Sequence, residues 1–333
     1  MDPGLRSPAY SVSIPKWVRT VIAVIMVYVM LSAAFSMIAP CILFGRHDGT
    51  QRRAYTYIDI SERHNREEFA FISGNNTLKG YFYPSDAPRG TLVLVNGIRS
   101  NADTHIPEIL YFLEKGWSVL TFDATGIGRS EGYSYMGLQQ IRMDLIALLT
   151  CSDAGEYLDG PVVLYGHSAG AYAAASVLDM GFDIKAAVCI AGFESPLDTM
   201  MYYGRKYTGF LAYSQYPFIF AESRFFFGKS SDVHASESIL SSDVPVLVIQ
   251  GDSDDIVDIE ISLYTALLDK PAPGVHLLLV DEEYRSEHST AWNTAEAAKY
   301  YSEDHEPVDK EKINELDEEF MGFILSFFES YTK

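Results

Sequence analysis

Short apolar runs alternate with helix-length stretches along most of the chain, from about residue 54 onward. Three early runs mix apolar and polar residues and are separated by turns rich in Gly and Asn, so they predict antiparallel strands over 54–60, 68–73 and 78–84. Six later runs are nearly all apolar, which is typical of strands that are buried on both faces of a sheet. These runs cover residues 91–96, 118–123, 161–166, 185–192, 244–251 and 274–281.

Segments in which apolar residues recur at helical spacing lie among the later runs, at 104–115, 137–151, 169–180 and 259–269. Repeated strand–helix–strand units of this kind predict an α/β fold, with a mostly parallel sheet that is covered by helices on both faces. We expect one last amphipathic helix over 310–331, with an acidic face that is exposed to solvent.

One connection between predicted strands is much longer than the others. About 50 residues separate the runs 185–192 and 244–251, and 12 of the 35 residues from Phe193 to Phe227 are aromatic. Connections of this length usually have a function of their own. We therefore expect an insertion over about 193–240 that forms a cap above the site. Its aromatic residues either bind a hydrophobic group of a ligand or fill the core of the cap itself.

Residues 20–39 form a run without any charged residue. In a helix such a run spans about 30 Å, the thickness of the hydrocarbon core of a bilayer. Trp17 and Arg19 lie at one end and Arg46 beyond the other, as residues at membrane interfaces do. A cleaved signal peptide would have a shorter apolar core, and here the best cleavage site is followed by Pro40. A core helix is the alternative, but a helix that packs on the surface of a domain is seldom apolar on all sides. We therefore expect one transmembrane helix.

The net charge changes sign along the chain. The whole chain has 25 basic and 45 acidic residues and a formal net charge of −20, whereas residues 1–53 have six basic residues against two acidic ones. We therefore divide the chain into a membrane anchor with its flanks, 1–53, and an acidic domain, 54–333. A domain this acidic repels the phosphate backbone, which argues against nucleic acid as a partner. Basic residues on the two sides of the apolar run are nearly balanced, and we expect the large domain on the extracytoplasmic side.

One short motif indicates a catalytic nucleophile. The residues from Gly166 to Gly170 match the pattern G-x-S-x-G, and they lie between the predicted strand 161–166 and the predicted helix 169–180. A nucleophile at such a tight strand-to-helix turn has a strained backbone, and side chains two residues before and after it would collide with their neighbours. The motif therefore predicts that Ser168 is a nucleophile and that both glycines support the turn.

A serine hydroxyl needs a base, and the base needs a carboxylate that orients it. In this arrangement the acid and the histidine follow the serine, in that order. Three acidic residues follow the run 244–251; the spacing G-x-x-D-x-x-V selects Asp254, while Asp252 and Asp255 are expected to shape the loop. His288 follows the last predicted strand after a short polar loop, and we expect it to be the base, with His305 as the alternative.

The oxygen that becomes negative during acyl transfer needs hydrogen-bond donors. The backbone N–H of Ala169, the residue after the serine, is one candidate. The other is the N–H of Ile98, in the loop that follows the run 91–96. Gly97 permits the turn of this loop and Asn96 precedes it.

In their order and spacing these residues resemble the α/β-hydrolase superfamily. The turn 166–170, the acid loop at Asp254 and the late His288 all match it, and the resemblance covers about residues 65–330. The stretch Asp123–Gly132, with the pattern D-x-x-G-x-G-x-S, is similar to that of the esterase, monoacylglycerol-lipase and serine-aminopeptidase-like branches. The resemblance implies an α/β-hydrolase fold and a Ser-His-Asp mechanism that uses neither a cofactor nor a metal.

One departure from this pattern is Asn96-Gly97, where such proteins usually have His-Gly. The complete set of catalytic residues and the aromatic insertion favour a membrane-anchored serine hydrolase that cleaves carboxylic esters with a hydrophobic acyl or alcohol group. The alternative is an amidase or aminopeptidase, which would need a carboxylate for the substrate ammonium; Glu194, Asp198 and Glu222 are available in the insertion. A protein with this fold that binds a ligand without catalysis is the third hypothesis. The expected partners are a small-molecule ester and the lipid bilayer.

Overall fold

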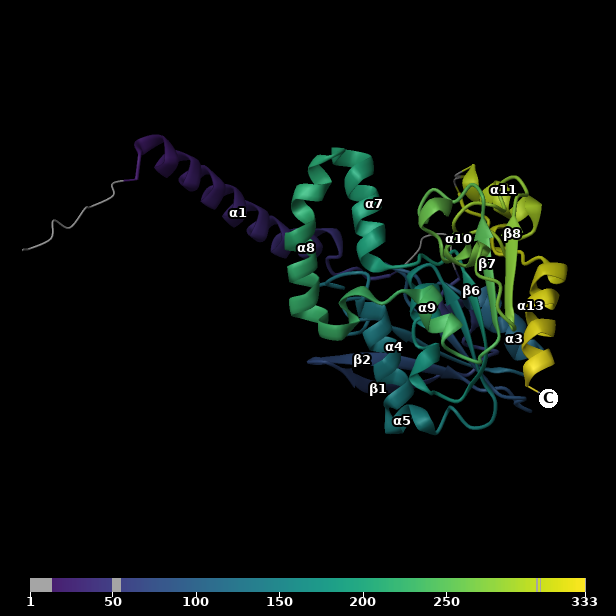
Figure 1. The fold of residues 1–333 in the computed structure, drawn as a ribbon. Coiled ribbons are helices and arrows are strands. Elements are labelled where there is room, and N and C mark those ends of the chain that lie inside the picture. Colours follow the sequence, from purple (N-terminus) through teal and green to yellow (C-terminus); the bar gives the residue numbers. More distant parts are fainter. Residues whose placement is uncertain (1–13, 50–54, 304, 306, 333) are drawn as a thin grey trace, which may run out of the picture.

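The computed structural model describes residues 14–49, 55–303, 305 and 307–332. Its centre is one sheet with the strand order β1-β2-β4-β3-β5-β6-β7-β8 (Figure 1). β1 and β2 pair antiparallel, as do β2 and β4, and all later pairs are parallel. The strands are β1 (Glu67–Ser73), β2 (Asn76–Tyr83), β3 (Thr91–Val95), β4 (Ser118–Asp123), β5 (Val162–His167), β6 (Ile184–Ile190), β7 (Val246–Gly251) and β8 (Val275–Val280).

Burial along the strands follows their place in the sheet. Every residue of β3, β4, β5 and β7 is buried, because helices cover both faces of the sheet at its centre. The edge strands β1 and β8 alternate between exposed and more buried residues. The predicted mostly parallel α/β sheet is confirmed, and its six apolar runs are the strands β3 to β8.

Two groups of helices cover the two faces of the sheet. α3 and α13 pack on one face, and α4, α6, α9 and α10 pack on the other. The helices of the domain are α2 (Tyr57–Ile60), α3 (Ile106–Glu114), α4 (Gln140–Thr150), α5 (Ser152–Gly155), α6 (Ala169–Ala175), α9 (Ala235–Leu240), α10 (Leu263–Leu268), α11 (Ala295–Ser302), α12 (Lys310–Ile313) and α13 (Glu318–Tyr331). Short 3₁₀ turns lie at η1 (Leu178–Met180), η2 (Gly228–Asp232) and η3 (Ile259–Ile261).

Two expected elements differ from the structure. The expected strand 54–60 contains the helical turn α2, because the Asp59 carboxylate accepts hydrogen bonds from the backbone N–H and the hydroxyl of Thr56 and so caps a helix. The expected helix 310–331 is divided into α12 and α13. Asp317 accepts a hydrogen bond from the backbone N–H of Phe320 and starts the second helix.

The long insertion folds mainly as a hairpin of two helices, α7 (Pro196–Thr208) and α8 (Leu211–Phe227), which we call the helical hairpin. It rises from the edge of the sheet at which the parallel strands end (Figure 1). The chain returns to the sheet through η2 and α9. None of the hairpin's described residues belongs to either hydrophobic core of the sheet, so the hairpin projects from the domain.

The amino-terminal apolar run forms α1 (Lys16–Leu43), a helix of 28 residues that includes the expected segment 20–39. α1 extends away from the domain (Figure 1), and only 11% of its most apolar window is buried. This exposure excludes a buried core helix. α1 is long and apolar enough to cross a membrane, and a signal sequence near the N-terminus can also meet these two criteria. The expected boundary between residues 53 and 54 lies outside the described residues.

Candidate active site

Ser168 lies at the turn between β5 and α6. Its backbone has a φ of 57° and a ψ of −121°, a strained conformation for a residue with a side chain. The glycines on either side allow this turn to form. A Cβ atom on Gly166 would lie 2.4 Å from the carbonyl oxygen of Gly170, and one on Gly170 would lie 1.9 Å from that of Val95. Any larger residue at these two positions would therefore displace the backbone around Ser168.

The structure brings His288 and Asp254 to Ser168 from separate loops. His288 Nε2 lies 2.9 Å from Ser168 Oγ, and His288 Nδ1 lies 2.8 Å from Asp254 Oδ2 and 3.0 Å from its Oδ1. Because a carboxylate only accepts hydrogen bonds, Nδ1 has the proton and Nε2 is left to accept the serine proton. This geometry is that of a nucleophile, a base and an orienting acid.

The backbone around Asp254 holds its carboxylate in place. The N–H groups of Ile256 and Val257 donate to Oδ1 over 2.9 and 2.7 Å, and the buried amide of Gln250 donates to Oδ2 over 3.3 Å. The side chain of Asp254 is fully buried, whereas Asp252 and Asp255 are exposed. The sequence pattern did not single out Gln250, because a glutamine at the end of a buried strand has no local signature.

The loop after β3 packs directly against the nucleophile turn. A Cβ atom on Gly97 would lie 3.1 Å from Ser168 Cβ, so glycine is needed for this close approach. Ile98 lines the same cavity as Ser168, and Ala169 is the first residue of α6, where helix N–H groups have no partner within the helix. The side chain of Asn96 points elsewhere: its amide donates to Thr121 Oγ1 over 3.1 Å. Asn96 is not among the described residues that line the cavity.

A cavity of about 230 Å³ opens beside Ser168 and His288. One wall has an unusual group of polar aromatic side chains, His105, His167 and Trp292, whose ring centroids lie 4.8 to 5.3 Å apart. His105 Nδ1 lies 2.6 Å from Glu108 Oε1, and both side chains are buried. The sequence pattern gave no indication of this pair, because the two residues meet at the start of α3 and nothing nearby in the sequence marks a cavity.

His167 belongs to this wall and forms a hydrogen bond with the backbone of His288. Its Nε2–H donates to the backbone carbonyl of His288 over 2.9 Å. Burial, together with the positive charges that His288 and His105 can have, holds the pKa of His167 well below its usual value. His167 is therefore a neutral residue that positions the loop of His288. The pattern G-x-S-x-G leaves this position open, so nothing in the sequence indicated this role.

Asp123, the first residue of the D-x-x-G-x-G-x-S stretch, forms hydrogen bonds that stabilise the loop after β3. Its carboxylate accepts hydrogen bonds from the Tyr81 hydroxyl and from the N–H groups of Arg129 and Ala102, over 2.8 to 2.9 Å. Burial raises the pKa of Asp123. These bonds join the stretch 123–130 to the segment that follows Ile98.

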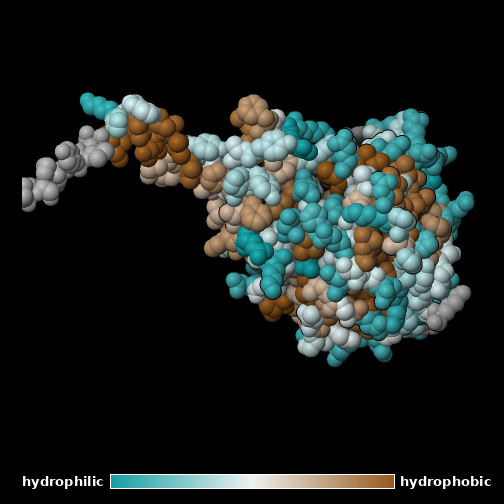
Figure 2. All heavy atoms as spheres, viewed as in Figure 1, coloured by the Kyte–Doolittle hydropathy of each residue, from teal (hydrophilic) through white to brown (hydrophobic). Residues whose placement is uncertain are grey.

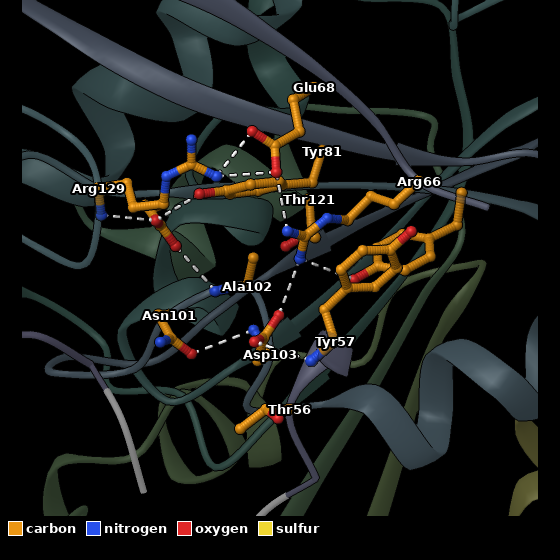
Figure 3. A network of polar contacts seen from close by, with 12 residues as sticks. Thr56, Tyr57, Arg66, Glu68, Tyr81, Asn101, Ala102, Asp103, Thr121 and Arg129 are labelled. Atoms are coloured by element: carbon orange, nitrogen blue, oxygen red, sulfur yellow. Dashed lines mark hydrogen bonds and ion pairs between the residues drawn. The ribbon is translucent and has the colours of Figure 1, made fainter. Parts of the chain in front are cut away.

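Arg66 packs behind Asp123 and stabilises the same loop through Tyr81 and Asp103. Its guanidinium lies over the rings of Tyr57 and Tyr81 and donates to Asp103 over 3.0 Å (Figure 3). Glu68 receives hydrogen bonds from both Arg66 and Arg129. The D-x-x-G-x-G-x-S stretch is thus part of a structural network behind the site and contributes no side chain to the cavity lining.

The helical hairpin does not line the cavity at Ser168; no residue of 193–240 is among the described residues that do. It contacts the acid loop instead, where the Tyr203 hydroxyl donates to the carbonyl of Ile256 over 2.7 Å and the Tyr202 hydroxyl to Asp258 over 2.5 Å. Within the described residues, no group of three or more His, Cys, Asp or Glu side chains is placed to hold a metal ion.

Comparisons with known proteins bear on the fold and the family. The family model of the serine aminopeptidases, S33, matches residues 86–212. No curated protein sequence matches the chain significantly. The structure of the esterase Pf2001 from Pyrococcus furiosus superposes with a TM-score of 0.58 at 20% identity, covering 84% of this chain and 96% of that one.

Two further structures are similar. Est1E from Butyrivibrio proteoclasticus, which was solved with bound ferulic acid, has a TM-score of 0.54 at 15% identity and covers 78% of this chain and 99% of its own. The acylaminoacyl peptidase of Pyrococcus horikoshii has a TM-score of 0.54 at 14% identity; 83% of this chain matches 43% of the peptidase. The chain therefore has the α/β-hydrolase fold, and its residues 86–212 are similar to the serine aminopeptidase family of hydrolases.

Proposed function

We propose that this protein is a membrane-anchored serine hydrolase that cleaves carboxylic esters, with Ser168, His288 and Asp254 as its catalytic triad. The observation that supports this most directly is the chain of hydrogen bonds from Ser168 Oγ through His288 to the buried Asp254 carboxylate. The residues stand in the order and at the distances that acyl transfer requires.

In the proposed mechanism, His288 Nε2 takes the proton of Ser168 as the hydroxyl oxygen attacks the ester carbonyl. The N–H groups of Ala169 and Ile98 stabilise the negative oxygen of the tetrahedral intermediate. His288 then gives the proton to the leaving alcohol, and an acyl-enzyme remains. Water, deprotonated by His288, attacks this acyl-enzyme and releases the carboxylic acid.

The size and the lining of the cavity indicate which part of a substrate fits there. Its volume of about 230 Å³ and its wall of two imidazoles, a carboxylate and an indole suit a small polar group of the ester. A hydrophobic group has to extend out of this cavity. Ile256, which lines the cavity, is held by Tyr203 of α7, so we place the hydrophobic group along the helical hairpin.

The amidase alternative lacks a free carboxylate at the cavity. None of Glu194, Asp198 and Glu222 lines it, and Glu194 accepts hydrogen bonds from both the N–H and the hydroxyl of Ser236. Glu108 does line the cavity, but its carboxylate is paired with the His105 imidazole. We therefore favour esters over substrates with a free amino group.

Membrane attachment is the second part of the proposal. α1 crosses the bilayer, and the hydrolase domain lies on the extracytoplasmic side. Digestion of intact cells with a protease tests this orientation: loss of the domain supports it, and a protected domain contradicts it.

Turnover of p-nitrophenyl esters of increasing chain length, compared with aminoacyl p-nitroanilides, tests the reaction class. We expect ester turnover that Ser168→Ala and His288→Ala each reduce to background. Ser289→Ala is the matched control, because Ser289 lines the same cavity and is expected to remain active. Full activity of Ser168→Ala would refute the triad, and faster turnover of the anilides would favour the peptidase alternative.

A further inference from the structure

The tip of the helical hairpin exposes large side chains. Tyr207, Phe210, Leu211 and Tyr213 lie within seven residues of one another, and between 57% and 80% of each is exposed. Soluble proteins seldom expose so many large apolar and aromatic side chains together. The whole stretch 207–221 has no charged residue, although the chain has a net charge of −20. A surface of this kind needs a partner that is apolar.

Basic residues border this uncharged stretch. Arg205 and Lys206 precede it on α7, and on α8 the buried Glu222 and then Arg224 follow it. The side chain of Lys206 is about half exposed. Amphipathic segments at membranes combine an apolar surface with basic residues at its border, because the apolar part enters the acyl chains and the basic groups reach the headgroups. The order of residues in the hairpin is therefore that of a segment that enters a lipid surface.

The hairpin also contacts α1 directly. The Tyr28 hydroxyl of α1 donates to the carbonyl of Ser214 over 3.2 Å, and the Gln215 amide donates to Tyr28 Oη over 3.1 Å and to Ser32 Oγ over 3.2 Å. The rings of Tyr28 and Phe218 meet edge to face, with centroids 6.3 Å apart. In Figure 2 the brown surface of α1 adjoins tan and brown atoms at the side of the domain where Figure 1 places α8.

The positions of Tyr28 and Ser32 along α1 determine how deep in a bilayer their contacts with the hairpin would lie. At a helical rise of about 1.5 Å per residue, Tyr28 lies roughly 16 Å from Ala39, near the middle of the segment 20–39. If α1 crosses a bilayer, the part of α8 that touches Tyr28 and Ser32 is within the hydrocarbon layer. Polar groups there are paired across the two helices, as polar groups in a membrane must be.

We propose that the tip of the helical hairpin, residues 207–221, enters the same bilayer that α1 crosses. This inference rests on the membrane anchor of the proposed function. It places the cavity close to the membrane surface, because Arg99, the neighbour of Ile98, donates to the carbonyl of Leu43 at the end of α1 over 2.8 Å. A substrate with a hydrophobic group is then taken from the bilayer, with the hairpin as its path.

Fluorescent labels at single cysteines test this inference on the full chain in vesicles of phosphatidylcholine and phosphatidylglycerol. The environment-sensitive label is attached at Phe210→Cys in a background with Cys41→Ser and Cys151→Ser. Phe323→Cys is the matched aqueous control, because Phe323 is 47% exposed and belongs to α13, which lies on the side of the domain opposite α1 (Figure 1). Leu31→Cys reports on α1 itself. Doxyl-labelled lipids quench labels in the membrane, and iodide quenches labels in water.

We expect doxyl lipids to quench the label at position 210 at least threefold more strongly than the label at 323, with the reverse order for iodide. Quenching of the label at 31 by lipid, combined with quenching of the label at 210 by iodide, would overturn the inference and leave the anchor intact. Labels at 31 and 210 that are both open to iodide would overturn the anchor as well. Protection of the label at 210 from both quenchers would mean that protein, such as a second copy of the chain, covers the tip, and would also overturn the inference.

Discussion

Replacement of His167 by Phe removes a buried hydrogen bond and a buried titratable group without leaving a large cavity. The imidazole donates to the carbonyl of His288, and the phenyl ring fills a similar volume without a donor. A buried carbonyl without a partner costs about 1–3 kcal/mol in the free energy of unfolding. We expect this loss at pH 7.5. We also expect a decrease of kcat for soluble esters, because the loop that positions His288 loses its support.

The effect on stability depends on pH. His167 has a depressed pKa when folded and an ordinary one, near 6.5, when unfolded, so the unfolded chain binds more protons as the pH falls through 6.5. In the wild type this proton uptake lowers the free energy of unfolding by about 1.4 kcal/mol at pH 5.5 and by less than about 0.1 kcal/mol at pH 7.5. The variant with Phe loses this pH dependence and becomes relatively more stable in acid.

Urea unfolding in detergent micelles at the two pH values, followed by the fluorescence of the buried Trp117 and Trp292, measures this difference. We expect the stability lost between pH 7.5 and 5.5 to be smaller in His167→Phe than in the wild type, by about 1.4 kcal/mol. His305→Phe, at an exposed position, is the control and is expected to match the wild type. An equal pH dependence in His167→Phe and wild type would refute the claim that a neutral, buried His167 supports His288.

Three further substitutions test other parts of the site. Asp254→Asn keeps the shape of the acid but favours the wrong tautomer of His288, and we expect kcat to fall about 10³- to 10⁴-fold in an ester assay; a fall of less than tenfold would contradict its role. Gly170→Ala places a methyl group against the Val95 carbonyl and is expected to lower stability by roughly 3 kcal/mol or more in thermal unfolding. Gly155→Ala, where nothing lies within 4 Å of the new Cβ, is the neutral control, and equal melting of the two variants would contradict the steric argument. Arg99→Ala removes the bond to α1, and we expect an approximately fivefold lower kcat with little change in KM, whereas unchanged kinetics would separate the anchor from the Ile98 loop.

Local patterns predicted most of the sheet. Strands at its centre are buried on both faces, so β3, β5 and β7 appear in the sequence as uninterrupted apolar runs with clear ends. The same logic failed at 54–60, where alternating residues suggested a strand but the capping bonds between Thr56 and Asp59 form a helical turn. It also failed at 310–331, where Asp317 starts a new helix within a continuous amphipathic pattern.

Prediction of the candidate site worked where one motif fixes both the backbone and the chemistry. The motif at Ser168, the spacing at Asp254 and the place of His288 after the last strand singled out all three residues that the structure brings together. His105, Glu108 and Gln250 were missed, because they approach the site through tertiary packing and no local pattern marks them. The contact between the insertion and α1 was missed for the same reason. The structure folds the aromatic insertion as the helical hairpin, which lies beside α1.

The most direct test of the proposed triad is covalent labelling with a fluorophosphonate probe, followed by peptide mass spectrometry of the modified residue. An activated serine reacts with this probe, and an ordinary serine does not. We predict a single adduct on Ser168 in the folded full-length chain, strongly reduced labelling in His288→Ala, and none in Ser168→Ala. Absence of an adduct in the wild type, or an adduct on a different serine, would contradict the proposal that Ser168 is the nucleophile.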